Sequence, residues 1–141
     1  MSARMTEKRA LSQVGVAYRL HARLPGIALD CAGLAGYAAL GKRGANLPTD
    51  YTMRGDYAGR VHCVLARARY RKLDASHEAI PGDIILCQTA PQQMHLVVRV
   101  GSGFVHGHAG LRRIVLMPLP SPWPILGIWR PYARSTQKRK L

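Results

Sequence analysis

The second half of the chain constrains the fold most, because from Pro81 onward the sequence becomes a series of short β-type runs separated by Gly and Pro. Five runs follow one another: GDIILCQT, HLVVRVG, GFVHGH, LRRIVLM and ILGIWR. Such runs are the length of strands rather than helices, and the intervening Gly and Pro favour turns. The sequence therefore predicts a small antiparallel sheet or barrel. The stretch PLPSPWP, residues 118–124, is too rich in proline for a strand interior and is expected to be a surface loop.

The first half has the spacing of helices. Apolar residues recur at helical intervals over 7–22, and Thr6 is placed to cap that helix. A second helix is expected over 31–40, with Asp30 at the N-cap position and Gly41 as its stop. Small residues dominate this second helix, so other elements can approach it closely. We expect it to be the central helix.

A third helix, amphipathic and basic, is expected from about residue 56 to residue 73. Helices followed by strands predict the α+β class, with the leading helices packed on the sheet. The chain has 141 residues, 48% of them hydrophobic, which is enough for one ordinary core. We expect one domain over 1–131 and a solvated basic tail over 132–141.

The chain is strongly basic, with 21 Lys and Arg against 7 Asp and Glu and a formal net charge of +14. This charge favours anionic partners: nucleic acid, an anionic envelope polymer, phospholipid or an acidic protein. A solvated, solubilising surface would have the same composition. Aromatic residues make up only 6%, and no stretch interleaves them with basic residues as a single-strand-binding surface would. Nucleic acid is therefore the weakest of the candidate partners.

The three cysteines, Cys31, Cys63 and Cys87, are odd in number and have no CxxC spacing. A zinc site or redox dithiol of the usual kind is not indicated. Cys63 and Cys87 are expected to be core thiols without a chemical role. The first residues lack an apolar run of signal-peptide length, and no stretch approaches a membrane span. We therefore expect synthesis in a cytoplasm without a signal peptide.

Cys31 opens the second helix, in the stretch LDCAGLAGYAAL. A thiol at a helix N-terminus experiences the positive end of the helix dipole, which favours the thiolate. The neighbouring unpaired amides can also hold an oxyanion. Cys31 is thus a candidate nucleophile, although a buried thiol that fills space would have the same sequence position.

Two histidines in the strand region are candidates for its base. His95 begins the run HLVVRV, and the turn GSG returns the chain with His106 at a comparable distance. The two are expected to be neighbours across a hairpin, where one accepts a proton and the other orients it. Half-buried polar histidines are the alternative. His108 shares a face with His106 by alternation, so the orienting residue is open between them.

The ordered set GVAY (15–18), LDCAGL (29–34), PGDIIL (81–86), HLVVRVGSGFVHG (95–107) and ILGIWRP (125–131) resembles an NlpC-type cell-wall peptidase. Its order and spacing are most similar to the phage-tail and gene-transfer-agent subgroup. The resemblance implies a papain-like α+β fold, with N-terminal helices packed on a small antiparallel sheet or barrel.

The resemblance also implies site residues: Cys31 as nucleophile, His95 as base and His106 as the residue that orients it. Tyr18 and Asp30 match residues that border the oxyanion and substrate site. A core aromatic and a plain N-cap are the structural alternatives for these two.

The implied function is a cysteine peptidase that hydrolyses an amide bond in peptidoglycan stem peptides, next to D-glutamate, without metal or other cofactor. The expected partners are this substrate, phage-tail-tip or hub proteins and an anionic envelope polymer, and the expected location is the virion tail tip or the cell wall. Two positions depart from the family pattern: Ala32 replaces a serine, and Val97 replaces a glycine. They support the alternative of an inactive tail-tip or assembly protein with the same fold. A basic nucleic-acid-binding module ranks third.

Overall fold

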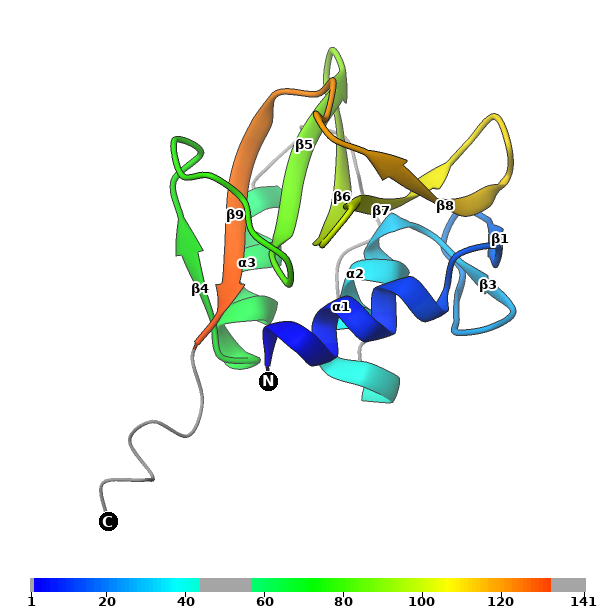
Figure 1. Cartoon of the computed structure of the whole chain (residues 1–141), viewed down its shortest axis with the longest axis horizontal. Coiled ribbons are helices and arrows are strands. Elements are labelled where there is room, and N and C mark those ends of the chain that lie inside the picture. Colours follow the sequence, from blue (N-terminus) through cyan, green and yellow to red (C-terminus); the bar gives the residue numbers. More distant parts are fainter. Residues whose placement is uncertain (1, 44–56, 133–141) are drawn as a thin grey trace.

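The structure, a computed structural model, describes residues 2–43 and 57–132 as a mixed α+β fold (Figure 1). Its helices are α1 (Ala3–Ser12), α2 (Cys31–Leu40), the short 3₁₀ helix η1 (Gly41–Arg43) and α3 (Tyr57–Arg67). Its strands are β1 (Ala17–Tyr18), β2 (Arg23–Leu24), β3 (Ala28–Leu29), β4 (Tyr70–Leu73), β5 (Ile84–Ala90), β6 (Gln93–Val100), β7 (Gly103–His108), β8 (Arg113–Pro118) and β9 (Ile125–Pro131).

The strands form one sheet in the order β2-β3-β1-β8-β7-β6-β5-β9-β4. Neighbouring strands are antiparallel except β1 and β3, which pair in parallel. The predicted α+β class and the five strands after Pro81 are confirmed, as is the β6–β7 hairpin through the GSG turn. Residues 119–124 connect β8 to β9 as the expected loop.

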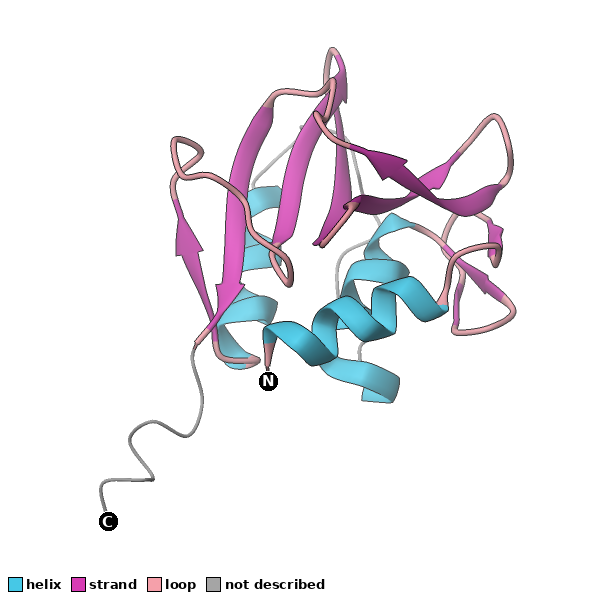
Figure 2. Ribbon diagram, in the orientation of Figure 1, coloured by secondary structure: helices cyan, strands magenta, loops and turns pink. Residues whose placement is uncertain are grey.

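Helix α2 lies at the centre of the fold, as predicted, and its observed bounds equal the predicted ones. Eight of its ten residues are buried, and they face two core clusters. One cluster joins Cys31 and Ala35 to α3 and to Leu96 of β6, and the other joins Leu34 to α1 and β7. The helices gather on one face of the sheet (Figure 2). A third cluster, around Val97 and Phe104, covers part of the other face.

The first helix is shorter than predicted. It begins at Ala3 because the Ser2 side chain accepts a hydrogen bond from the amide of Met5, so Ser2 rather than Thr6 is the N-cap. It ends at Ser12, and Gly15 then adopts φ 93°, which a helix cannot continue. Tyr18 consequently lies in strand β1 and not in a helix.

The third helix is also shorter than predicted. Its buried face, Tyr57, Val61 and Leu65, follows the expected spacing. Arg69 adopts φ 67° and ends the helical path, and the residues after it form β4, paired with β9. Cys63 is exposed, so its prediction as a core thiol is wrong, whereas Cys87 is buried as expected. The predicted tail lies outside the described residues except for Tyr132.

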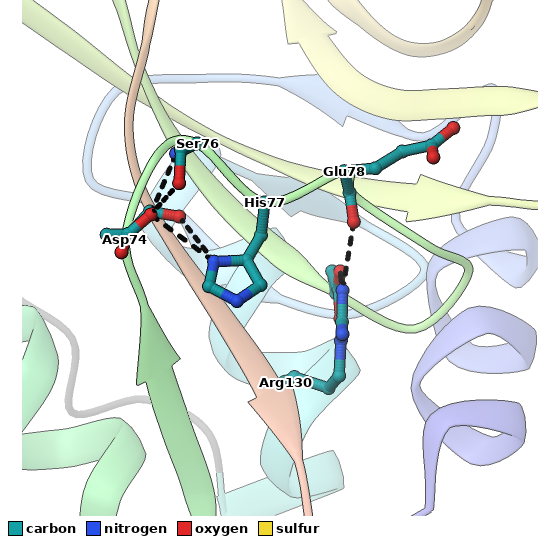
Figure 3. A network of polar contacts seen from close by, with 6 residues as sticks. Asp74, Ser76, His77, Glu78 and Arg130 are labelled. Carbon is teal, nitrogen blue, oxygen red and sulfur yellow. Dashed lines mark hydrogen bonds and ion pairs between the residues drawn. The ribbon is translucent and has the colours of Figure 1, made fainter.

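Polar contacts hold the connection between β4 and β5 (Figure 3). The Asp74 carboxylate accepts hydrogen bonds from the Ser76 amide and hydroxyl and contacts the His77 ring. Arg130 of β9 pairs with the buried Asp83 carboxylate at 2.8 Å and donates to the Glu78 carbonyl at 3.1 Å. This connection is thereby fixed to the sheet beside it.

Gly103 and Gly101 of the β6–β7 turn give a matched test of packing. A Cβ at Gly103 would lie 1.9 Å from the Met117 carbonyl oxygen, whereas one at Gly101 would meet only the flexible Glu7 carboxylate at 3.3 Å. Because backbone cannot yield as a side chain can, Gly103→Ala is expected to lower the free energy of unfolding by about 1–3 kcal/mol. Gly101→Ala is the control, expected within about 0.5 kcal/mol of wild type. Urea unfolding measures both, and equal losses would contradict the packing described.

Candidate active site

The first turn of α2 is fixed by the Asp30 carboxylate. This side chain is completely buried; it accepts a hydrogen bond from the Gly33 amide at 2.6 Å and lies 3.3 Å from Arg23 Nε. Asp30 is therefore an N-cap, as predicted, and the ion pair with Arg23 offsets the cost of burying its charge. Its other predicted role, at the substrate site, stays a prediction.

Cys31 follows as the first residue of α2 and is completely buried. Burial raises the pKa of its thiol to about 12, against smaller lowering effects from hydrogen bonds with the amides of Leu96 and Ala32. Desolvation therefore exceeds the effect of the helix N-terminus, and the expectation of a lowered pKa is wrong. In this structure the residue is a neutral thiol packed against β6.

His95 and His106 are neighbours, as the hairpin predicted, with ring centroids 5.7 Å apart. His95 Nε2 lies 3.1 Å from the Gly107 carbonyl oxygen, and His106 Nδ1 lies 3.0 Å from the same oxygen. Because a carbonyl only accepts, each ring donates to it, which leaves Nδ1 of His95 as the unprotonated nitrogen of the neutral ring. The two rings are thus held in a fixed relation through one backbone atom.

Both histidines are poor bases for solvent protons. Burial, with a smaller contribution from His106, lowers the pKa of His95 to about 4. Burial also lowers the pKa of His106. Both rings are consequently neutral at neutral pH, so His95 is able to accept a proton from a nearby group.

The histidines line a cleft of about 270 Å³. Its walls are Tyr18, Thr89, Gln93, His95, His106, Gly107, His108, Ala109, Gly110 and Trp123. The Tyr18 and Trp123 rings lie edge-on to His95, with centroids at 6.3 and 6.0 Å. Burial raises the pKa of Tyr18 to about 12, so its hydroxyl remains a hydrogen-bond donor. The cleft is lined by aromatic rings and by several polar side chains, among them Thr89, Gln93 and the histidines.

Gly107 lets Tyr18 approach the histidines. A Cβ at Gly107 would lie 2.1 Å from Tyr18 Cδ1, so the Tyr18 ring packs directly on the backbone whose carbonyl binds both histidines. No side chain larger than hydrogen fits there without displacing the ring. The fold places Tyr18 of β1 next to Gly107 of β7, although the two strands are distant in the sequence.

Cys31 lies beside this group but does not join it. It packs in the helix-side core with Leu96, whereas Val97, on the His95 side of β6 by alternation, packs on the other face. The Cys31 sulfur accepts a hydrogen bond from the backbone amide of Leu96, the residue after His95. Among the described residues, those that line the cleft do not include Cys31. Tyr18, His95 and His106 are therefore brought together as predicted, with the thiol adjacent beneath the strand.

The two departures from the family pattern both lie in the core. Ala32 is completely buried in the same core cluster as Cys31. A serine hydroxyl at this position would therefore lie in the core and not on an open surface. Val97 is 1% exposed and packs with Phe104. Its side chain lies on the same face of β6 as His95 by alternation. His62 accepts a hydrogen bond from Trp129 Nε1 and so packs against the core away from the cleft.

Sequence reasoning missed Trp123 and the Gly107 carbonyl. Trp123 lies in the proline-rich loop, 5.0 Å from the His106 ring, and a lone tryptophan in such a loop was the only available signal. A backbone carbonyl leaves no signal in the sequence. His108 accepts a hydrogen bond from the Leu111 amide at 3.1 Å and thus holds the β7–β8 turn, while His106 is the ring beside His95.

Residues 2–43 and 57–132 contain no group of three or more His, Cys, Asp or Glu placed to hold a metal ion. Within the same ranges, no helix is long and apolar enough to cross a membrane.

No family model matches the sequence, and no curated protein matches it. The structure is similar to NlpC1 of Trichomonas vaginalis, with a TM-score of 0.62 and 20% identity over 92% of this chain. It is also similar to the peptidoglycan hydrolase RipB of Mycobacterium tuberculosis, with a TM-score of 0.56 and 21% identity over 91% of this chain. A P60 domain from an antigen of M. avium subspecies paratuberculosis gives 0.58 and 19% identity over 92% of this chain.

The chain spans 44% of the NlpC1 chain and 63% of the RipB chain, but 93% of the P60-domain chain. At these identities the likeness establishes the fold, which is the papain-like NlpC fold that the sequence predicted.

The lowered pKa of His95 predicts acid sensitivity. The unfolded chain binds protons near pH 6.5 and the folded ring only near pH 4, so stability is complete above pH 6.5 and is lost as the pH falls toward 4. In the His95→Gln variant, the free energy of unfolding is expected to fall by about 1–3 kcal/mol less than in the wild type as the pH is lowered over this range. Urea unfolding between pH 4.5 and 7.5 measures it. His77→Gln, at an exposed histidine, is the control and should keep the wild-type slope; an unchanged slope in His95→Gln would refute the assignment.

Proposed function

We propose that this protein is a cysteine peptidase that hydrolyses an amide bond in peptidoglycan stem peptides. One observation carries the proposal: an NlpC fold places a cysteine-initiated helix against the strand that presents His95 to a cleft shared with His106 and Tyr18. RipB, one of the similar structures, is a peptidoglycan hydrolase. The substrate class follows from this likeness and from the sequence motifs together.

The proposed reaction begins from a protonated thiol, because burial keeps the pKa of Cys31 high. The sulfur attacks the scissile carbonyl while its proton passes to His95, whose Nδ1 has no proton in the neutral ring. Amides at the start of α2 stabilise the oxyanion. His95 then protonates the leaving amine, and water activated by the same ring releases the acyl group from Cys31.

His106 has a positioning role in this scheme. His106 donates from Nδ1 to the Gly107 carbonyl that also accepts from His95, and its Nε2 side packs against the Met117 side chain, so the ring has a fixed place. A fixed His106 restricts the orientation of His95. The scheme uses no metal ion and no organic cofactor.

The proposal requires that the Cys31 sulfur reaches His95 and the cleft when substrate binds, because without substrate it is buried on the helix side of β6 and His95 lies on the other side. The same burial favours a second candidate, an assembly protein that keeps the fold without turnover. Ala32 and Val97, both buried in the core, are consistent with that reading. Turnover by the purified protein separates the two candidates.

We propose a phage-tail setting for the enzyme, in which a tail tip delivers it to the wall. The order and spacing of the motifs support this setting. The net charge of +14 suits contact with acidic tail proteins or an anionic envelope polymer.

Replacement of the proposed nucleophile is the direct test. Cys31→Ala removes one sulfur atom from a core position, so the variant is expected to fold and to lose roughly 10³-fold or more of its turnover. Hydrolysis of synthetic stem peptides, followed by chromatography and mass spectrometry, measures the rate. Cys63→Ala is the control, since it removes an exposed thiol of α3 that is not among the residues lining the cleft. Turnover retained in Cys31→Ala would eliminate the mechanism.

A further inference from the structure

A second hollow lies next to the histidine cleft. It has a volume of about 540 Å³ and is lined by Ala17, Tyr18, Arg19, Leu20, Ala109 and Arg112. Tyr18 and Ala109 line both the hollow and the cleft, so the two are contiguous. The hollow lies where β1 and the β7–β8 connection meet. These two segments lie at one end of the molecule (Figure 1).

Both arginines of the hollow are held by the backbone. The Arg19 amide donates to the Leu29 carbonyl at 3.1 Å, two residues before Cys31. The Arg112 carbonyl accepts from the Tyr18 amide at 3.0 Å. The turn that carries Arg112 is fixed in addition by the hydrogen bond from the Leu111 amide to His108. The two side chains therefore start from fixed points on neighbouring segments of the hollow.

The charge of these arginines is not balanced by the acidic groups whose contacts the structure describes. Asp30 pairs with Arg23, Asp83 with Arg130, and Glu7 accepts from the Gly101 amide, while the fourth, Asp74, contacts Ser76 and His77. Neither Arg19 nor Arg112 has an ion pair within residues 2–43 and 57–132. Two exposed guanidinium groups therefore face one hollow beside the cleft.

Guanidinium groups bind carboxylates through paired hydrogen bonds, and two of them lining one hollow favour an anion there. The rest of the lining is Ala17, Leu20, Ala109 and the Tyr18 ring, which suits a short peptide. We propose that Arg19 and Arg112 form a subsite for a free carboxylate of the substrate peptide, next to the bond that is cut. This inference rests on the proposed function for the identity of the peptide.

Two labelled peptides test the subsite. Both are the tetrapeptide L-Ala-γ-D-Glu-L-Lys-D-Ala with an amidated C-terminus, and they differ only in whether the D-glutamate α-carboxyl is free or is a carboxamide. Wild-type protein is expected to bind the carboxylate form about tenfold more tightly, as two partly solvated charge-assisted bonds allow. Fluorescence anisotropy gives the dissociation constants, and chromatography of the same samples gives the rate of cleavage.

Arg19→Gln and Arg112→Gln are each expected to remove most of this preference by weakening only the carboxylate form. Arg71→Gln, at an exposed position of the far edge strand β4, is the matched control and should keep the preference. Equal affinity of the wild type for the two peptides, or equal weakening of both peptides in the variants, would overturn the subsite.

The two proposals fail in different ways. A preference for the carboxylate form without cleavage would support the subsite and contradict the peptidase. Cleavage without a preference would support the peptidase and contradict the subsite. If the wild type neither binds nor cleaves either peptide, both proposals are wrong.

Discussion

The buried cap of α2 is the interaction on which the rest of the arrangement depends. Eight of the ten residues of the helix are buried, including its whole first turn, so unsatisfied amides there would be costly. Asp30 satisfies the Gly33 amide, and Arg23 from β2 compensates the carboxylate. This pair therefore fixes both the start of α2 and the short strands around it. Cys31 takes its position against β6 as a consequence.

The Gly107 carbonyl organises the other half of the candidate site. A single acceptor holds both His95 and His106, and the Tyr18 ring packs on the same residue. Such a backbone acceptor cannot be lost by a side-chain change, but it depends on the absence of a Cβ at Gly107. The distance between the histidines is thus set by the path of β7 more than by either ring.

Much of this fold follows from local patterns in the sequence. The bounds of α2 were predictable because Asp30 and Gly41 are strong caps, and the β6–β7 hairpin because its turn is marked by glycines. Strands β1 to β3 were not predictable, since each has only two residues and exists through pairing with distant segments, such as Ala17 with Arg113. Tyr18 was assigned to a helix for that reason.

The error over Cys31 has the same origin. A helix N-terminus is a local feature that lowers the pKa of a thiol, but burial is a tertiary feature, and here its effect is larger. The buried neutral thiol of Cys31 and the neutral imidazole of His95 carry no charge that must be desolvated before substrate arrives. Charge separates only when the proton moves from sulfur to His95, and a substrate that excludes water from the cleft would strengthen the attraction between the two ions. Burial of Cys31 is therefore compatible with catalysis, provided that substrate binding brings the scissile carbonyl to the sulfur.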